Sequence, residues 1–207
     1  MQRRGDDLRD RILSAAKDVF LAHGFDRASM DLIAEKADTT KRTLYAHFES
    51  KEKLFLAIVD YTRGLLAARL KFPADYGDDP DHALVLFCGR FLETMIWNRS
   101  IRMCRLTLAE AGRFPDGAAL FHEAIFGTVQ DRLATYLRER LAVPKSTATR
   151  AAVDLLGRIL YPRFTRALFG AEPEVELHDD AAQPSEHVDL KPIRAAVAET
   201  LRAARAR

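Results

Sequence analysis

The amino-acid sequence predicts an all-α protein, with a three-helix head joined by a fourth helix to a larger helical bundle. Three observations support this fold class. Apolar residues recur at three- and four-residue spacing along most of the 207 residues, as they do on one face of a helix. Nowhere do apolar and polar residues alternate over the length that a half-buried strand requires. Residues that begin and end helices punctuate the apolar series.

Four helices are predicted in the first third of the chain. The first is expected to end at Gly24, which would serve as a C′ glycine. The next three should each begin at a hydroxyl side chain, because an oxygen at the N-cap accepts from a free backbone amide. These expected caps are Ser29, Thr39 or Thr40, and Ser50.

The chain is predicted to divide near residues 71–80, where proline, glycine and acids interrupt the helical pattern. Beyond this point the apolar spacing again predicts helices, one of them broken at Pro162. The acidic stretch 171–186 is expected to be an exposed loop. The predicted helices span 80–97, 101–111, 115–142, 147–169 and 188–204.

The composition is that of a globular protein without a strong charge bias. The chain has 32 Lys+Arg and 30 Asp+Glu, a net charge of +2, so any basic surface must be local. It has neither a signal peptide nor a run of 18 apolar residues, which predicts a cytoplasmic location. Cys88 and Cys104 lack metal-ligand spacing and are expected to be buried thiols. No metal or other cofactor is expected, because no two histidines have metal-ligand spacing among His23, His47, His82, His122, His178 and His187.

Residues 30–48 have the plan of a helix-turn-helix, in which two short helices flank a tight turn. Asp38 stands in the turn where glycine is usual, and aspartate tolerates a left-handed backbone. Leu44 and Phe48 should face inward on the second helix. Its other side chains would point partly outward, where hydroxyls and phenols donate to phosphates and Lys or Arg reaches guanine. Taken alone, the pattern also fits a solvated helix face over a small core.

Residues 8–55 resemble the DNA-binding head of the TetR family of transcriptional regulators. The resemblance rests on Gly24–Phe25, Ser29, Ile33–Ala34, the run from Leu44 to Phe48, and Lys51. It departs from the family pattern at Asp38 and Thr39, where Gly-Val is more usual.

The resemblance implies a role for each matched polar residue of this head. Tyr45, His47 and Lys51 would hold phosphates, while the start of the second helix would approach bases. A homodimer would bind a roughly palindromic operator. The full set of expected DNA contacts is Ser29, Thr40, Lys41, Arg42, Thr43, Tyr45, His47 and Lys51.

The second part of the chain contains one segment that resembles the AefR-like type of TetR C-terminal domain, with the pattern Arg105, Glu110 and Arg113–Phe114–Pro115. An effector pocket between helices needs apolar walls and a few polar anchors. Its candidate lining is Phe87, Phe91, Met95, Met103, Glu110, Phe121, Phe126, Tyr161 and Phe164, although aromatics and methionines at helical spacing are more often core. Glu110 is expected to be the only buried acid there, satisfied by Arg105, Arg113 or a ligand donor.

Two apolar series near the end of the chain could pair across a two-fold axis as a four-helix interface. Alternatively, they could simply cover the core of one chain. The first series is Val153, Leu156, Leu160 and Phe164, and the second is Leu190, Ile193, Val197 and Leu201.

The predicted function is that of a DNA-binding transcriptional regulator, a ligand-responsive repressor. Residues 1–55 would bind DNA, and residues 56–207 would bind the effector and dimerise. Its partners would be a double-stranded operator, a second copy of the chain and an unidentified small molecule, with no membrane. The sequence leaves two other classes of protein open. A helical protein-interaction adaptor would leave the face of residues 40–51 unused, and an enzyme would need a nucleophile elbow, a phosphate loop or paired acids, none of which the sequence shows.

Overall fold

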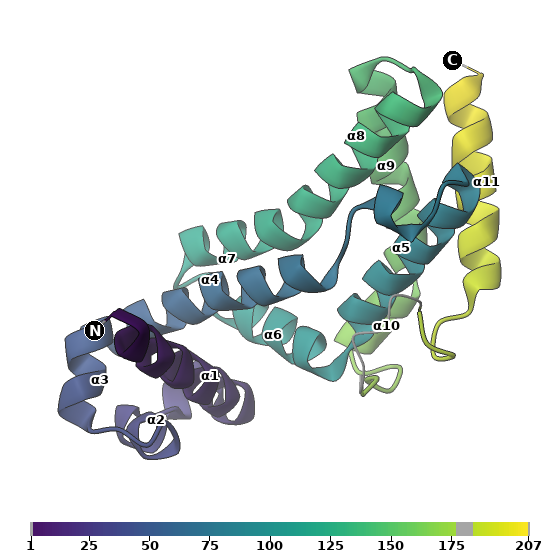
Figure 1. Cartoon of the computed structure of the whole chain (residues 1–207). Coiled ribbons are helices and arrows are strands. Elements are labelled where there is room, and N and C mark those ends of the chain that lie inside the picture. The colour runs from purple at the N-terminus through teal and green to yellow at the C-terminus, as the bar shows by residue number, and fades with distance from the viewer. Residues whose placement is uncertain (1, 177–183, 207) are drawn as a thin grey trace. The chain divides into compact units, whose positions relative to one another are not determined.

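The structure is a computed structural model that describes residues 2–176 and 184–206. All regular elements in these residues are helices, apart from one isolated bridge between Trp97 and Val175. The all-α prediction is therefore confirmed (Figure 1). Among the described residues, no helix combines the length and the apolarity that crossing a membrane requires.

The chain forms two compact units, and each is built from two separate segments. The head unit consists of Met1–Leu65 and Arg102–Phe121, and the bundle unit consists of Leu66–Ile101 and His122–Arg207. These units differ from the division predicted after residue 55, because residues 102–121 pack with the N-terminal helices. Sequence periodicity identifies helices, but it does not show which distant segments pack together.

The head unit contains the helix-turn-helix and the helices that support it. Phe20, Phe25 and Phe55 are buried and pack ring against ring in its core. Its elements are α1 (Gln2–Arg27), α2 (Met30–Lys36), α3 (Lys41–Phe48), the part of α4 (Lys51–Arg69) up to Leu65, the part of α6 (Asn98–Ala109) from Arg102, and α7 (Pro115–His122) up to Phe121.

The predicted helix ends in the head are confirmed. The backbone of α1 breaks at Gly24, where φ is 72°, a conformation that glycine adopts without strain. Asp38 has φ 49° in the turn between α2 and α3, the left-handed conformation that was predicted for it. The hydroxyls that cap α2, α3 and α4 accept hydrogen bonds from backbone amides and belong to Ser29, Thr40 and Ser50.

The bundle unit is organised around α5 (Pro80–Ile96), whose residues from Ala83 to Ile96 are all buried. In Figure 1, α8 and α9 run beside each other, and α11 lies along α5 and α9. The remaining elements are the 3₁₀ turn η1 (Pro73–Tyr76), the π-helical turn η2 (Glu123–Gly127), α8 (Thr128–Leu141), α9 (Lys145–Leu160), α10 (Arg163–Leu168) and α11 (Leu190–Arg205).

Two features of the bundle refine the predicted helices. The predicted helix 115–142 is interrupted by the π-helical turn η2, which no residue pattern announces. The predicted break at Pro162 is confirmed, since α9 ends at Leu160 and α10 begins at Arg163. In the predicted loop 171–186, the amide of Val175 donates to the carbonyl of Ile96. Residues 177–183, including His178, lie outside the described part of the chain.

Candidate nucleic-acid interface and bundle cavity

The α3 helix presents a polar face to solvent and an apolar face to the head core. Leu44 and Phe48 are buried, as predicted. Lys41, Arg42 and Tyr45 are exposed and occupy one side of the helix, because residues at i and i+4 share a face. His47 is exposed in the last turn. The head therefore offers a phenol, an imidazole and two cations on its second short helix, which is the element that enters the major groove in helix-turn-helix proteins.

The hydroxyl side chains that were predicted to contact DNA all lie at or near the N-terminus of a helix. Ser29 Oγ accepts from the amide of Leu32 at 3.1 Å, and Thr40 Oγ1 accepts from the amide of Thr43 at 3.1 Å. The Thr40 and Thr43 hydroxyl oxygens lie 2.9 Å apart and share a hydrogen bond. A capping hydroxyl uses a lone pair and keeps its O–H as a donor. Ser29 and one hydroxyl of the threonine pair thus retain a proton that can be donated to a phosphate.

Lys41 forms an ion pair across the turn. Its Nζ lies 2.9 Å from Asp31 Oδ2, which is carried by α2. The hydrogen bond to Asp31, together with the negative charge of that carboxylate, raises the pKa of Lys41. The ammonium is therefore charged at neutral pH, but an acid that repels phosphate lies beside it.

Lys51, predicted to contact phosphate, is held within the head in this structure, and its role on DNA stays a prediction. Its Nζ donates to the carbonyls of Phe25, Asp26 and Ala28 at 2.9, 3.2 and 3.1 Å. An ammonium has three N–H donors, so all of them are used within the head. Lys51 satisfies carbonyls at the end of α1 that have no partner inside that helix.

The bundle unit contains a small apolar cavity beside α5. Its volume is about 20 Å³, roughly the space of one water molecule. Phe91 and Met95, both predicted to line a pocket, lie in its wall together with residues of η2. The other lining residues are Leu70, Thr94, Ala124, Ile125, Thr128, Val129 and Arg132.

The other predicted pocket residues do not gather at this cavity. Phe126 packs against Phe91 and Phe164 at centroid distances of 6.5 and 6.2 Å, which extends an aromatic cluster within the bundle. Phe87 packs against Tyr76. Tyr161 is 71% exposed and does not line this cavity. The remaining three belong to the head unit rather than to the bundle: Met103, Glu110 and Phe121.

Glu110 was expected to be a buried acid, and this expectation is wrong. Its side chain is only half-buried near the end of α6. Arg113, one of its expected partners, instead lies 3.0 Å from Asp26 Oδ1. A helix end faces more solvent than a helix middle, which the apolar spacing around Glu110 does not reveal.

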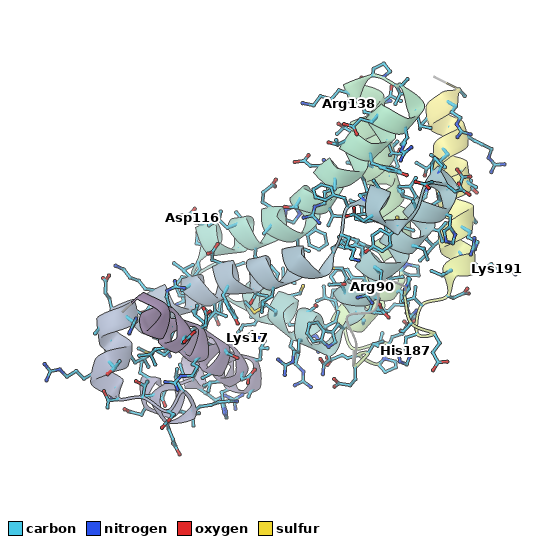
Figure 2. All side chains as sticks on the ribbon, viewed as in Figure 1. Lys17, Arg90, Asp116, Arg138, His187 and Lys191 are labelled. Carbon is cyan, nitrogen blue, oxygen red and sulfur yellow. The ribbon has the colours of Figure 1, made fainter. Side chains whose placement is uncertain are left out.

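The buried acid that sequence reasoning missed is Glu93 on α5. It is 0% exposed, and its carboxylate accepts from the Arg90 guanidinium and from the Ser185 amide. Figure 2 labels Arg90 on α5. The sequence does contain a signal for this pair, because an arginine and a glutamate lie three residues apart in an otherwise apolar helix. When such a helix is buried, the two charges must pair with each other.

Most of the residues predicted for a dimer interface face the interior of their own chain. The stripe on α11 packs against α5 and α9, which matches the alternative that it covers the monomer core. Those buried in this way are Leu156, Phe164, Ile193, Val197 and Leu201. Leu160 and Leu190 are half-buried, and Val153 is 47% exposed. Among the residues predicted for the interface, Val153 on the outer face of α9 is thus the most exposed.

Comparisons with known proteins match both parts of the chain. Residues 12–58 match the family described as bacterial regulatory proteins, tetR family. Residues 82–191 match the AefR-like transcriptional repressor, C-terminal domain. The regulator TcmR of Streptomyces glaucescens is 30% identical over 82% of this chain and 71% of its own length. Other curated relatives match over a shorter part, 25% to 44% of their own length.

Solved structures show the same fold along nearly the whole chain. A TetR-family regulator from Mesorhizobium loti superposes with a TM-score of 0.78 at 22% identity, covering 98% of this chain and 97% of that one. The flavonoid-responsive regulator FrrA gives a TM-score of 0.72 at 29% identity, covering 96% and 97%.

Proposed function

Because this chain belongs to the TetR family of bacterial transcriptional regulators, we propose that it is a ligand-responsive repressor that binds a palindromic operator as a homodimer. It is a DNA-binding regulator and not an enzyme. Repression is the direction named in the family description that matches residues 82–191.

The observation that carries the proposal is the exposed face of α3. Arg42 stands free of any acid partner in the described residues, so its guanidinium is available for guanine or phosphate. Tyr45 is 42% exposed on the same face, although its apolar neighbours Leu44 and Phe48 are buried. A phenol held open to solvent beside an arginine suits a phosphate backbone flanking readable bases.

Selection from a random duplex library tests this function. The full-length protein should enrich a palindromic sequence, and the logarithm of its affinity should fall steeply with the logarithm of salt concentration. Arg42→Ala should cost roughly 1–3 kcal/mol and relax the preference at particular base pairs. Tyr45→Phe should weaken binding to all duplexes about equally. Arg138→Ala, on α8 of the bundle unit (Figure 2), is the control for loss of one charge. Failure to enrich any duplex would refute the function.

The homodimer is proposed to form through the outer stripe of α9. Val153, Gly157 and Leu160 follow at spacings of four and three residues, and Tyr161 comes directly after them. None of these four is fully buried, and Tyr161 is 71% exposed. Exposed apolar residues arranged along one helix face suit a self-complementary contact with a second copy.

The effector is proposed to enter the bundle beside Phe91 and Met95. The cavity there is apolar but small, so a ligand must displace side chains to bind. The relative FrrA is flavonoid-responsive by name, and the cluster of Phe91, Phe126 and Phe164 suits a flat aromatic molecule. A flavonoid panel should contain a compound that raises the melting temperature and weakens operator binding. Phe91→Leu should reduce both effects, whereas a panel without any such compound would refute this class.

A further inference from the structure

Two cations from distant parts of the chain lie against one buried ring at the end of α1. The Phe25 side chain is 1% exposed. Lys51 Nζ lies 4.5 Å from its ring centroid, and the guanidinium carbon of Arg113 lies 4.4 Å from it. Both distances are within the range of cation–π attraction. Lys51 follows the helix-turn-helix directly, but Arg113 comes from the connection between α6 and α7.

Arg113 also links the ends of two helices through their acids. Its guanidinium lies 3.0 Å from Asp26 Oδ1 at the end of α1 and 3.8 Å from Glu52 Oε1 at the start of α4. The pKa of Glu52 is lowered, chiefly by its own backbone amide and the Ser50 hydroxyl, with a further contribution from the charge of Arg113. A single planar cation thus contacts two carboxylates and the Phe25 ring, and it also lies 5.6 Å from the centroid of the Phe114 ring.

The next residues extend the same contact into the core of the head unit. The Phe114 ring packs against Phe25 and Phe55 at centroid distances of 5.2 and 5.1 Å. At Gly117 an added Cβ would lie 2.6 Å from Leu56 Cδ2. The absence of a side chain at residue 117 therefore allows the close contact between α7 and α4.

These contacts fix the two ends that frame the helix-turn-helix. Asp26 lies three residues before Ser29, the N-cap of α2, and Glu52 lies four residues after Phe48, the last residue of α3. A rotation of either end would therefore move the recognition face of α3. We infer that Arg113 and Phe114 are positioning residues for operator binding, although they lie outside residues 12–58, which match the tetR family model. This inference rests on the proposed DNA binding.

The chemistry of the site requires arginine rather than any cation. A guanidinium is flat, so it can lie against a ring while its N–H groups reach two carboxylates in its own plane. A lysine at this position would keep the positive charge but could not stack a planar group on the Phe25 ring. Arg113→Lys should therefore fail to restore what Arg113→Ala loses.

The experiment uses the full-length protein and a duplex enriched from a random library by the wild type. Arg113→Ala should bind this duplex roughly tenfold more weakly. The slope of log affinity against log salt should not change, because Arg113 touches no phosphate. Hydrogen exchange should become faster at the amides of residues 26–28 and 50–53. Arg138→Ala should change none of these values.

Asp26→Asn provides a second test that does not disturb the core, since the Asp26 side chain is 83% exposed. It should weaken binding in the wild type but add nothing to Arg113→Ala, because both changes break the same contact. Unchanged operator affinity in Arg113→Ala would overturn the inference, and so would a salt slope reduced by about one, which indicates a phosphate contact. If the wild type enriches no duplex, the proposed function fails instead.

Discussion

Arg90 and Glu93 form an ion pair within one turn of α5, and their side chains are only 5% and 0% exposed. The Glu93 carboxylate also holds the Ser185 amide, which ties the segment before α11 to α5. Pro184 and Leu190 lie so close to Gly89 that a Cβ there would come within 2.8 Å of both. A buried carboxylate and the absence of one side chain together seat this segment on the central helix.

The first prediction concerns that pair. Glu93→Gln or Arg90→Met should each destabilise the protein by about 3–5 kcal/mol, because each leaves one buried charge without its partner. The double substitution should cost clearly less than the sum of the two. Urea unfolding followed by the fluorescence of Trp97, the single tryptophan, measures this in the bundle unit. Additive costs would show that the two side chains do not stabilise each other.

The second prediction concerns Lys51, which ties the start of α4 to the end of α1. Lys51→Met should destabilise the head by roughly 1–3 kcal/mol, because three carbonyls lose a charged donor. Lys53→Met is a matched control, since Lys53 lies in the same first turn of α4 and its ion pair in the described residues is with the exposed Glu49 at the end of α3. Hydrogen exchange of residues 25–28 reports the effect. If the exchange rate stayed normal and the salt slope of DNA binding fell, Lys51 would instead be a phosphate contact, as the sequence predicts.

The third prediction concerns the two cysteines, which are buried thiols as the sequence predicted. Burial raises the pKa of Cys88 and of Cys104 to about 12, because the thiolate is poorly solvated there. Both thiols therefore stay protonated as pH rises from 7 to 9, and their reaction with a disulfide reagent should be much slower than that of a free thiol. Reaction should become fast for both in denaturant. Rapid modification of either thiol in the native protein would contradict the burial.

The fourth prediction separates the two apolar faces near the end of the chain. Val153→Glu should produce a monomer of nearly normal stability, because Val153 is 47% exposed within the chain. Val197→Glu should instead unfold the bundle, since Val197 lies on the buried face of α11 and is 1% exposed. Light scattering and circular dichroism distinguish the outcomes. A Val153→Glu protein that remains dimeric would place the interface elsewhere.

The sequence predicted local features well because they depend on neighbouring residues. Ser29, Thr40 and Asp38 act on the backbone within four residues, so their caps and turn follow from residue type alone. Features that join distant segments were not predictable in this way. In the sequence Lys51 has no visible partner, because the carbonyls that accept from it lie more than 20 residues earlier. The apolar stripe on α11 looked available for a second copy of the chain, because the helices that bury it, α5 and α9, are distant in sequence. Periodicity shows that a helix face is apolar, but not what covers it.

The discontinuous head unit also has a consequence for how the protein is made. Residues 1–65 leave the ribosome well before residues 102–121, which complete the head. At ordinary rates of synthesis the delay is roughly 3–10 s. During that time Phe25 and Phe55 lack the Phe114 ring that packs against them, and Asp26 lacks its arginine. The core of the head is therefore completed only after residues 102–121 are made, and a nascent chain stopped before Arg113 should bind DNA less well than the full chain.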